Sequence, residues 1–282
     1  MYVVAIPSYN RAESLVKKTL TTLKRGKVPA SKIHIFVANK TEEKIYKENV
    51  PQNLYHKIVV GKLGISNQRN FIKKYFKEGQ YVVSIDDDVE RLFRLQGEKE
   101  ITIANIDGFF KKAYQELKKH KLFLWGIYPI GNTFFMKGKN KLTTDLRFII
   151  GVLHGYIVRN QKGDRSLQTN AGSEGKEDYE QTLLYYLKDG GVIRFNDVAA
   201  KTRFFAPGGL GDVKKRIISS KKAVKYLKKT YPDYITVYHR DNGMAEVKFV
   251  KQKNGAGTTK KIKSTKKKRT LQQRRKTKKK SK

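Results

Sequence analysis

The stretch that decides the fold is SNQRNFIKKYFKEGQYVVSIDDD, residues 66–88. It begins as an amphipathic helix, which we expect to start at Ser66 as the N-cap and to stop at Gly79. A short apolar strand follows at residues 81–85, and three consecutive aspartates come directly after it. A helix that leads into a buried strand, with polar residues at the strand's end, is typical of an α/β protein.

The same alternation of strand and helix fills the residues before this stretch. Its apolar and amphipathic runs predict a strand at 2–6, a helix at 12–24, a strand at 32–38, a helix at 41–50 capped by Thr41, and a strand at 56–60. Strands that alternate with helices predict an α/β fold with a mostly parallel sheet and helices on both faces. Ligands of such sheets collect at the carboxyl ends of the strands. Four polar segments lie at those ends: Pro7 to Asn10, Asn39-Lys40, Gly61 to Ser66, and Asp86 to Asp88.

The second half of the chain is less regular. It predicts helices at 104–120, 178–188 (ended by Gly190) and 219–230, strands at 122–130, 147–160 and 192–195, and a hairpin at 234–250 with its turn at 241–243. Residues 251–282 are almost devoid of apolar side chains, so we expect them to be disordered. The sequence therefore predicts one folded domain over 1–250 and a disordered Lys/Arg-rich tail over 251–282.

The charge of the chain is strongly positive, with 62 Lys and Arg against 25 Asp and Glu, or +37. Residues 251–282 hold 16 of these basic residues and no acid, which leaves +21 for residues 1–250. A basic body favours a polyanionic partner such as nucleic acid, an anionic glycan, a phosphorylated ligand or an anionic membrane surface. Solubility is the alternative explanation of the charge.

The absence of cysteine excludes disulfides, thiolate chemistry and zinc–thiolate sites. The N-terminus lacks the pattern of a signal peptide, and no apolar stretch reaches 18 residues. We therefore expect a cytoplasmic protein (of the host cytoplasm or nucleus, if it is viral) that is not secreted and has no transmembrane segment.

The aspartates are the strongest candidates for chemistry. Asp86 and Asp88 are two residues apart just past a strand, so extended geometry directs both side chains to one side. Carboxylate oxygens of this kind suit Mg²⁺ or Mn²⁺ together with ligand phosphates. The alternative is an acidic turn satisfied by backbone amides or lysines. His154 and His239 are candidates for a third metal ligand, although a single histidine more often packs or lies exposed.

Three further features each have two interpretations. Arg69 could pair with a diphosphate or with Asp86, or it could be an exposed helix arginine. Glu177 and Asp178 could cap a helix, or one of them could be the base that deprotonates a hydroxyl. The loop at 207–212, next to Lys214, Lys215 and Arg216, could close over a phosphate or be an ordinary surface loop. Neither a P-loop nor a dinucleotide-binding motif is present.

Three segments together resemble the GT-A glycosyltransferases of the family 2 type. The family's opening strand and nucleotide-contacting turn resemble VVAIPSYNR. Its Arg-Asn helix and Asp-x-Asp strand resemble GISNQRNFIKKYFKEGQYVVSIDDDVERL. Its Glu-Asp helix and the strand after it resemble EDYEQTLLYYLKDGGVIRFNDV. The resemblance covers residues 2–200. It implies a nucleotide-binding half over 1–100 and an acceptor half over 101–250.

The resemblance also implies a role for each candidate residue. Pro7, Tyr9 and Arg11 would line the nucleoside pocket, and Asp87 would belong to the same nucleotide-sugar site. Asp86 would contact the ribose or the metal, Asp88 would hold the divalent ion on both phosphates, and Arg69 would contact the nucleotide or brace the aspartates. Asp178 would be the base, with Glu177 beside it, and the reaction would invert the anomeric centre. Asn39 stands where the family often has an acid, which leaves the nucleotide's identity open.

The C-terminal half, from FFAPGGLGD onward, resembles phage and large-virus glycosyltransferases related to enzymes that glucosylate modified pyrimidines in DNA. That resemblance and the charge favour a DNA acceptor held electrostatically. Two alternatives stay open: a glycosyltransferase of glycans or glycoproteins, and a non-catalytic nucleic-acid-binding protein on a transferase scaffold. The tail could instead serve localisation or solubility.

Overall fold

A large central sheet organises the protein. The computed structural model describes residues 1–138, 140–159, 166–202, 213–240 and 244–250, with the backbone alone for 213–216. Within these residues the sheet has eight strands in the order β3-β2-β1-β4-β9-β7-β10-β8. Their bounds in that order are Lys57–Val60, Ile33–Val37, Tyr2–Pro7, Tyr81–Ile85, Leu153–Ile157, Leu124–Ile127, Ile193–Phe195 and Leu142–Thr143.

Most neighbouring strands of this sheet are parallel. β1 pairs in parallel with β2 and β4, β2 with β3, and β7 with β10. β9 runs antiparallel between β4 and β7, and β8 runs antiparallel to β10. The prediction of a mostly parallel α/β sheet is confirmed. Its inner strands are mostly apolar, as expected where helices cover both faces of a sheet.

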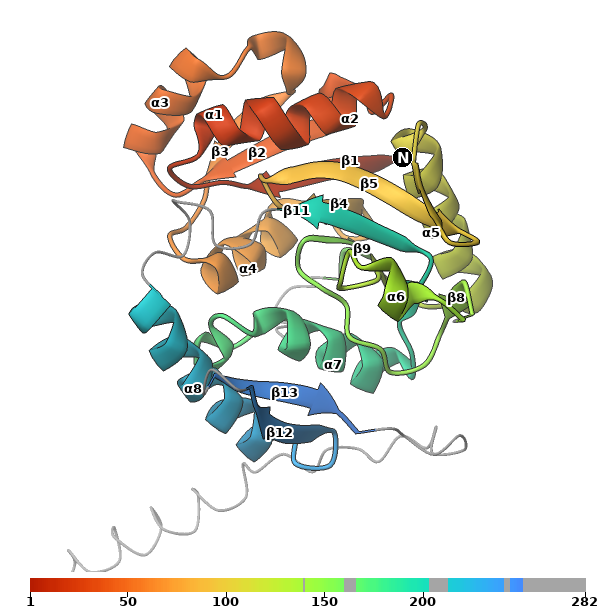
Figure 1. The fold of residues 1–282 in the computed structure, drawn as a ribbon. Coiled ribbons are helices and arrows are strands. Elements are labelled where there is room, and N and C mark those ends of the chain that lie inside the picture. Colours follow the sequence, from red (N-terminus) through yellow and green to blue (C-terminus); the bar gives the residue numbers. More distant parts are fainter. Residues whose placement is uncertain (139, 160–165, 203–212, 241–243, 251–282) are drawn as a thin grey trace, which may run out of the picture. The chain divides into compact units, whose positions relative to one another are not determined.

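Two helical layers cover the sheet. One apolar cluster joins β1 and β2 to α1 (Ala12–Leu15), α2 (Thr21–Arg25), α3 (Lys40–Asn49) and α5 (Ile106–His120). A second cluster joins the opposite face to α4 (Ile65–Tyr75) and α7 (Glu177–Asp189). Figure 1 shows α1, α2 and α3 on one side of the sheet and α4 and α7 on the other. The π-helical segment η1 (Val16–Leu20) continues α1 into α2, and short 3₁₀ turns occupy η2 (Ala30–Lys32), η3 (Gln52–Leu54) and η4 (Ala171–Ser173).

A second, antiparallel sheet was not predicted from the sequence. It has the order β11-β5-β6, with bounds Val198–Thr202, Val89–Gln96 and Lys99–Thr102. The adjacent Leu92 and Phe93 are both buried, so β5 lacks the alternation of apolar and polar residues that marks a half-buried strand.

The structure corrects several element boundaries. Asn39, not Thr41, caps α3, and its side chain accepts a hydrogen bond of 2.9 Å from the Glu42 amide. Gly64, not Ser66, precedes α4, with a φ of 87° that favours glycine. The predicted strands 122–130 and 147–160 are shorter, because α6 (Thr133–Met136), β8 and an irregular segment occupy the residues between β7 and β9.

The C-terminal part of the described chain packs on α7. Helix α8 (Val213–Thr230) starts earlier than predicted, and the hairpin of β12 (Ile235–His239) and β13 (Ala245–Phe249) is confirmed. Leu183 of α7 shares an apolar cluster with residues of α8 and of the hairpin. The predicted turn at 241–243 and tail at 251–282 lie outside the described residues. None of the helices described here is both long and apolar enough to cross a bilayer.

Candidate active site

A cavity of about 530 Å³ opens at the carboxyl edge of the parallel strands. Residues that follow β1, β2, β3 and β4 line it, together with the segment before β9 and the start of α7. Three of the four polar segments predicted to meet at this edge line the cavity, and Asn39-Lys40 does not. Of the predicted site residues, the cavity is lined by Pro7, Tyr9, Arg11, Arg69, Asp86, Asp87, Asp88, Glu177 and Asp178.

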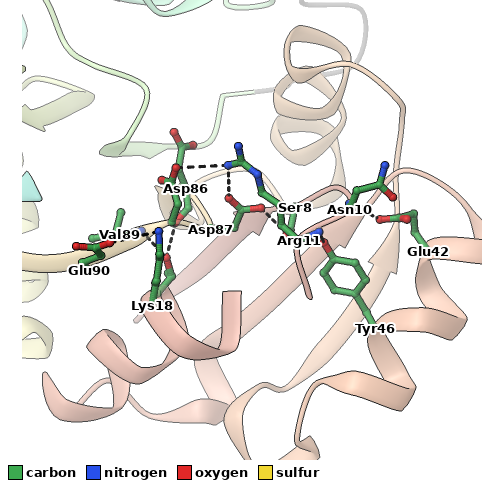
Figure 2. A network of polar contacts seen from close by, with 12 residues as sticks. Ser8, Asn10, Arg11, Lys18, Glu42, Tyr46, Asp86, Asp87, Val89 and Glu90 are labelled. Atoms are coloured by element: carbon green, nitrogen blue, oxygen red, sulfur yellow. Dashed lines mark hydrogen bonds and ion pairs between the residues drawn. The ribbon is translucent and has the colours of Figure 1, made fainter. Parts of the chain in front are cut away.

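The three aspartates follow β4 in a tight turn that leads into β5, and a polar network holds this turn (Figure 2). The Ser8 hydroxyl donates to Asp87 at 2.6 Å and lies 2.7 Å from the Tyr46 hydroxyl. The Arg11 guanidinium lies 3.2 Å from Asp87 and 3.4 Å from Asp88. Arg11 thus lines the cavity as predicted, but its charge faces the aspartates.

The π-helical segment η1 holds the backbone of the same turn. The Thr19 hydroxyl donates to the carbonyl oxygen of Asp86 at 2.8 Å and accepts from the Val89 amide at 2.9 Å. Thr19 therefore bridges both ends of the turn. Single π-helical turns occur often at functional sites, because the extra residue redirects one side chain.

Arg69 joins four parts of the chain. Its guanidinium lies 2.5 Å from Glu177 and donates to Asp86 and to the carbonyl oxygen of Gly151, both at 3.1 Å. The side chain is buried, with 7% of the residue exposed. A planar guanidinium with several fixed donors suits such a position better than a lysine would. Of the three aspartates after β4, Arg69 contacts Asp86.

Gly151 allows Arg69 to approach the backbone. A Cβ atom at this position would lie 2.4 Å from the Arg69 Nη1 atom, which is closer than real Cβ contacts come. The Gly151 amide also donates to the Asp178 carboxylate at 3.2 Å. Gly151 therefore accepts a hydrogen bond from Arg69 through its carbonyl oxygen and orients Asp178 through its amide.

The two acids at the start of α7 differ in their surroundings. Glu177 is buried, with one oxygen on Arg69 and the other accepting from the Gly175 amide at 3.1 Å. Asp178 accepts from the amides of Gly151 and Tyr179 and is only partly buried. Glu177 is thus placed to hold Arg69, and Asp178 is the acid available to a ligand in the cavity.

Burial of several acids in one cavity raises their pKa values. Withdrawal from water raises the pKa of Asp86 to about 7, with Asp88 and Asp87 adding to the rise and Arg69 opposing it. Withdrawal from water, together with the charge of Glu177, raises the pKa of Asp178, again against Arg69. The pKa values of Asp87 and Asp88 are raised for the same main reason. A cluster of this kind favours the arrival of a cation.

The donor set of Asp86 and Asp88 fits a hard divalent cation that keeps other oxygen ligands. Their side chains are 30% and 16% exposed, so both carboxylates reach the cavity. Among the described residues, no group of three or more His, Asp or Glu side chains is arranged to hold a metal by itself. Mg²⁺ commonly binds through one or two carboxylates plus substrate phosphates, and this set offers that arrangement.

Several predicted residues lie away from the cavity. Asn39 is exposed and engaged as the cap of α3, so it does not line the cavity. His154 is buried in β9 and His239 is exposed on β12, and neither lines the cavity. The loop at 207–212 and the side chains of Lys214, Lys215 and Arg216 lie outside the described part of the chain.

A family model for TET-associated glycosyltransferases matches residues 2–203, which is more than half of the chain. The chain belongs to this family. It is therefore a glycosyltransferase, and the predicted enzyme class is confirmed. No curated protein sequence matches it.

Solved structures resemble this TET-associated glycosyltransferase in fold. The mannosyltransferase PcManGT from Pyrobaculum calidifontis, in complex with GDP-Man and Mn²⁺, has a TM-score of 0.50 at 15% identity, over 82% of this chain and 64% of that one. TarS residues 1–349 from S. aureus score 0.49 at 15% identity, over 82% and 72% of the two chains. Glucosyl-3-phosphoglycerate synthase from Mycobacterium tuberculosis, in complex with Mn²⁺, UDP and glucosyl-3-phosphoglycerate, scores 0.48 at 10%, over 89% and 87%.

Three residues of this glycosyltransferase site were given no role from the sequence. Ser8 and Thr19 hold the aspartate turn through hydroxyl groups, and single hydroxyl residues carry no pattern that would mark them. Gly151 had a usable signal, because an isolated glycine inside an apolar run often marks a close approach of the backbone.

Replacing Arg69 with Met is expected to destabilise the TET-associated glycosyltransferase by about 3–5 kcal/mol, because Glu177 and Asp86 would lose the cation that compensates them. Urea unfolding measures this loss. Arg147→Met is the matched control, since Arg147 pairs with Asp145 at an exposed site and should cost below about 1 kcal/mol. Equal losses in the two variants would contradict the bracing role.

Proposed function

We propose that this glycosyltransferase is metal-dependent and inverting, and that it moves a sugar from a nucleotide-diphospho-sugar to a hydroxyl group on a modified base in DNA. One observation carries the proposal: a single cavity holds the aspartates after β4, Arg69 and Asp178. The parts needed for the donor and for the attacking hydroxyl therefore face the same space.

The donor would lie along the carboxyl edge of β1 to β4. Pro7 and Tyr9 would line the nucleoside, and Tyr9 is 37% exposed beside the cavity and free to cover a base. Asp87 is buried under Ser8 and Arg11, so its part would be to hold the turn that presents its two neighbours. Asn39 has no part in this donor site, because it does not line the cavity.

Asp88 and Asp86 would hold Mn²⁺ or Mg²⁺. The bound ion would act as a Lewis acid for the leaving nucleoside diphosphate. The chain's own contribution is the orientation of the two carboxylates: Thr19 holds the turn's backbone, Arg69 holds Asp86, and Arg11 lies against Asp88. Such fixed charges cost no rearrangement when the reaction occurs.

Asp178 would remove the proton from the acceptor hydroxyl. Its raised pKa makes it a stronger base than an exposed aspartate, and the amides of Gly151 and Tyr179 orient it. With one base on the acceptor and a diphosphate as the leaving group, a direct displacement would invert the anomeric centre. Glu177 would support Asp178 indirectly by holding Arg69.

DNA is the proposed acceptor because the body of the chain carries +21 without its tail. A modified pyrimidine in a duplex would have to leave the base stack to bring its hydroxyl into the cavity. The sequence resemblance to viral glycosyltransferases of DNA bases supports the same acceptor. The alternatives to a DNA acceptor are a glycan or glycoprotein acceptor, or a non-catalytic protein on a transferase scaffold.

The test is release of nucleoside diphosphate from a panel of UDP- and GDP-sugars with Mn²⁺. Acceptors are duplex DNA with hydroxymethylated pyrimidines, the same duplex unmodified, and soluble glycans. We expect release only with one donor and the hydroxymethylated duplex, and a matching mass increase of the DNA. Transfer to glycans alone would refute the DNA acceptor, and no turnover with any donor would refute the enzymatic proposal.

A further inference from the structure

A second hollow lies between helix α8 and the β12–β13 hairpin, outside the region that the family model matches. It has a volume of about 490 Å³, and four lysines of α8 line it: Lys221, Lys225, Lys228 and Lys229. Val224, Val237 and Ala245 form an apolar floor. We call this hollow the α8 groove. None of its features takes part in the cavity described above.

The lysines of the α8 groove are available to an external anion. Lys221, Lys225 and Lys229 are exposed, and within the described residues none of them forms an ion pair with a carboxylate. Lys228 differs, because its ammonium donates to the carbonyl oxygens of Pro232 and Ile235 and so holds the connection from α8 to β12. Three cations that pair with no carboxylate of the described residues thus line one groove.

Among the residues that the structure describes, the carboxylate of the hairpin does not neutralise the groove. Helix α8 contains no acidic residue. Glu246 of the hairpin is buried between Lys176, at 2.7 Å, and Arg240, at 3.2 Å. Residues 213–250 hold ten Lys or Arg against three acids, one of them Glu246. The groove is therefore a positive surface along α8 and not a helix face with mixed charges.

The spacing of the three lysines fits an extended polyanion. They recur every four residues, so they lie on one side of α8 at intervals of about 6 Å and span about 12 Å. A DNA duplex carries roughly seven phosphates along about 12 Å of its axis. Lysine side chains over that length can each reach a phosphate, whereas a single phosphorylated small molecule would occupy only one or two of them.

The α8 groove is also joined firmly to the helix that carries Asp178. Val224 and Leu227 of α8 pack with Leu183 of α7, and the buried pair of Lys176 and Glu246 connects the start of α7 to β13. We propose that the α8 groove binds the phosphate backbone of duplex DNA and holds the acceptor near the cavity. That the bound DNA is the acceptor rests on the proposed function, whereas the binding of DNA to the groove does not require sugar transfer.

The test compares two full-length triple variants by fluorescence anisotropy on a labelled, unmodified duplex over a series of salt concentrations. The first is Lys221→Gln, Lys225→Gln, Lys229→Gln. We expect its affinity at low salt to fall by on the order of 10- to 100-fold, and the slope of log K against log salt to decrease by about 2.7. The matched control is Lys44→Gln, Lys112→Gln, Lys119→Gln, whose lysines are exposed on α3 and α5 and should leave the slope nearly unchanged.

Two further comparisons separate DNA binding by the α8 groove from sugar transfer by the enzyme. The midpoint of thermal unfolding should be the same in both variants, which excludes a folding defect. An unchanged slope in the α8 variant, or an equal decrease in the control, would overturn the inference whether or not the enzyme glycosylates DNA. If the α8 variant loses binding to vesicles of anionic phospholipid but still binds the duplex, the inference is also overturned, and the groove would bind a membrane surface instead.

Discussion

The Asp178→Asn variant is expected to lose sugar transfer by roughly 10²- to 10⁴-fold, the range that general bases contribute. The amide side chain keeps the shape of the carboxylate and can still accept from the Gly151 amide. It cannot take a proton from the acceptor. Donor binding should survive, because the aspartates after β4 and Arg69 do not depend on Asp178 for their contacts.

The pH dependence of the wild-type enzyme provides a second readout for Asp178. Burial and the charge of Glu177 raise its pKa, so the carboxyl becomes protonated, and the base is lost, as the pH falls through that raised value. We therefore expect kcat/KM to fall on the acid side at a higher pH than an ordinary aspartate would give. The residual activity of Asp178→Asn should lack that acid limb.

Asp233→Asn is the matched control for this prediction, since Asp233 is exposed in the connection before β12. Its kcat, KM and pH profile should equal those of the wild type. Binding of the nucleotide-sugar, measured by thermal shift with Mn²⁺, should be similar in all three proteins. If Asp178→Asn retains full turnover, the base is another group and the assignment fails.

The Asp88→Asn variant is expected to reduce turnover by about 10²- to 10³-fold and to weaken the dependence of activity on Mn²⁺. An amide oxygen is a poorer ligand for a hard divalent cation than a carboxylate is. The fold should persist, because Arg11 keeps its contact with Asp87 at 3.2 Å and Ser8 still holds the turn. The defect should therefore be confined to the metal.

Electron paramagnetic resonance of Mn²⁺ gives a readout for Asp88 that does not need turnover. Titration of the protein in the presence of UDP should show weaker Mn²⁺ binding in Asp88→Asn. The control is Asp145→Asn, which removes an exposed partner of Arg147 and should leave Mn²⁺ binding unchanged. Unchanged Mn²⁺ affinity and full turnover in Asp88→Asn would refute the metal site.

The central sheet could be predicted from the sequence because its signals are local. Strands such as 2–6 and 81–85 are apolar along their length, and each is followed by polar residues. Parallel order then follows from the helices between them. The second sheet could not be predicted in this way. Its strand β5 pairs with β11, about a hundred residues later, and its burial depends on that partner.

The residues of the candidate site could be predicted better than their contacts. Strand order predicted the positions of Asp86 and Asp88 at this edge, and only the family resemblance added Arg69 and Asp178. The pairing of Arg69 with Glu177, across 108 residues, could not be predicted, because no local pattern in the sequence marks a contact over that separation. The resemblance named Asp178 as the base, and the burial of Glu177 and the position of Gly151 give a physical reason to separate the two acids. For Asn39 the position itself misled. Its place after β2 suggested a contact with the nucleotide-sugar, but its side chain caps helix α3.

The ion pair between Lys176 and Glu246 has a consequence for where autonomous folding ends. A chain stopped at residue 203, where the family match ends, would leave Lys176 without its partner and expose the apolar side of Leu183 to water. The smallest catalytic unit should therefore extend through Phe249, and shorter fragments should aggregate when expressed alone.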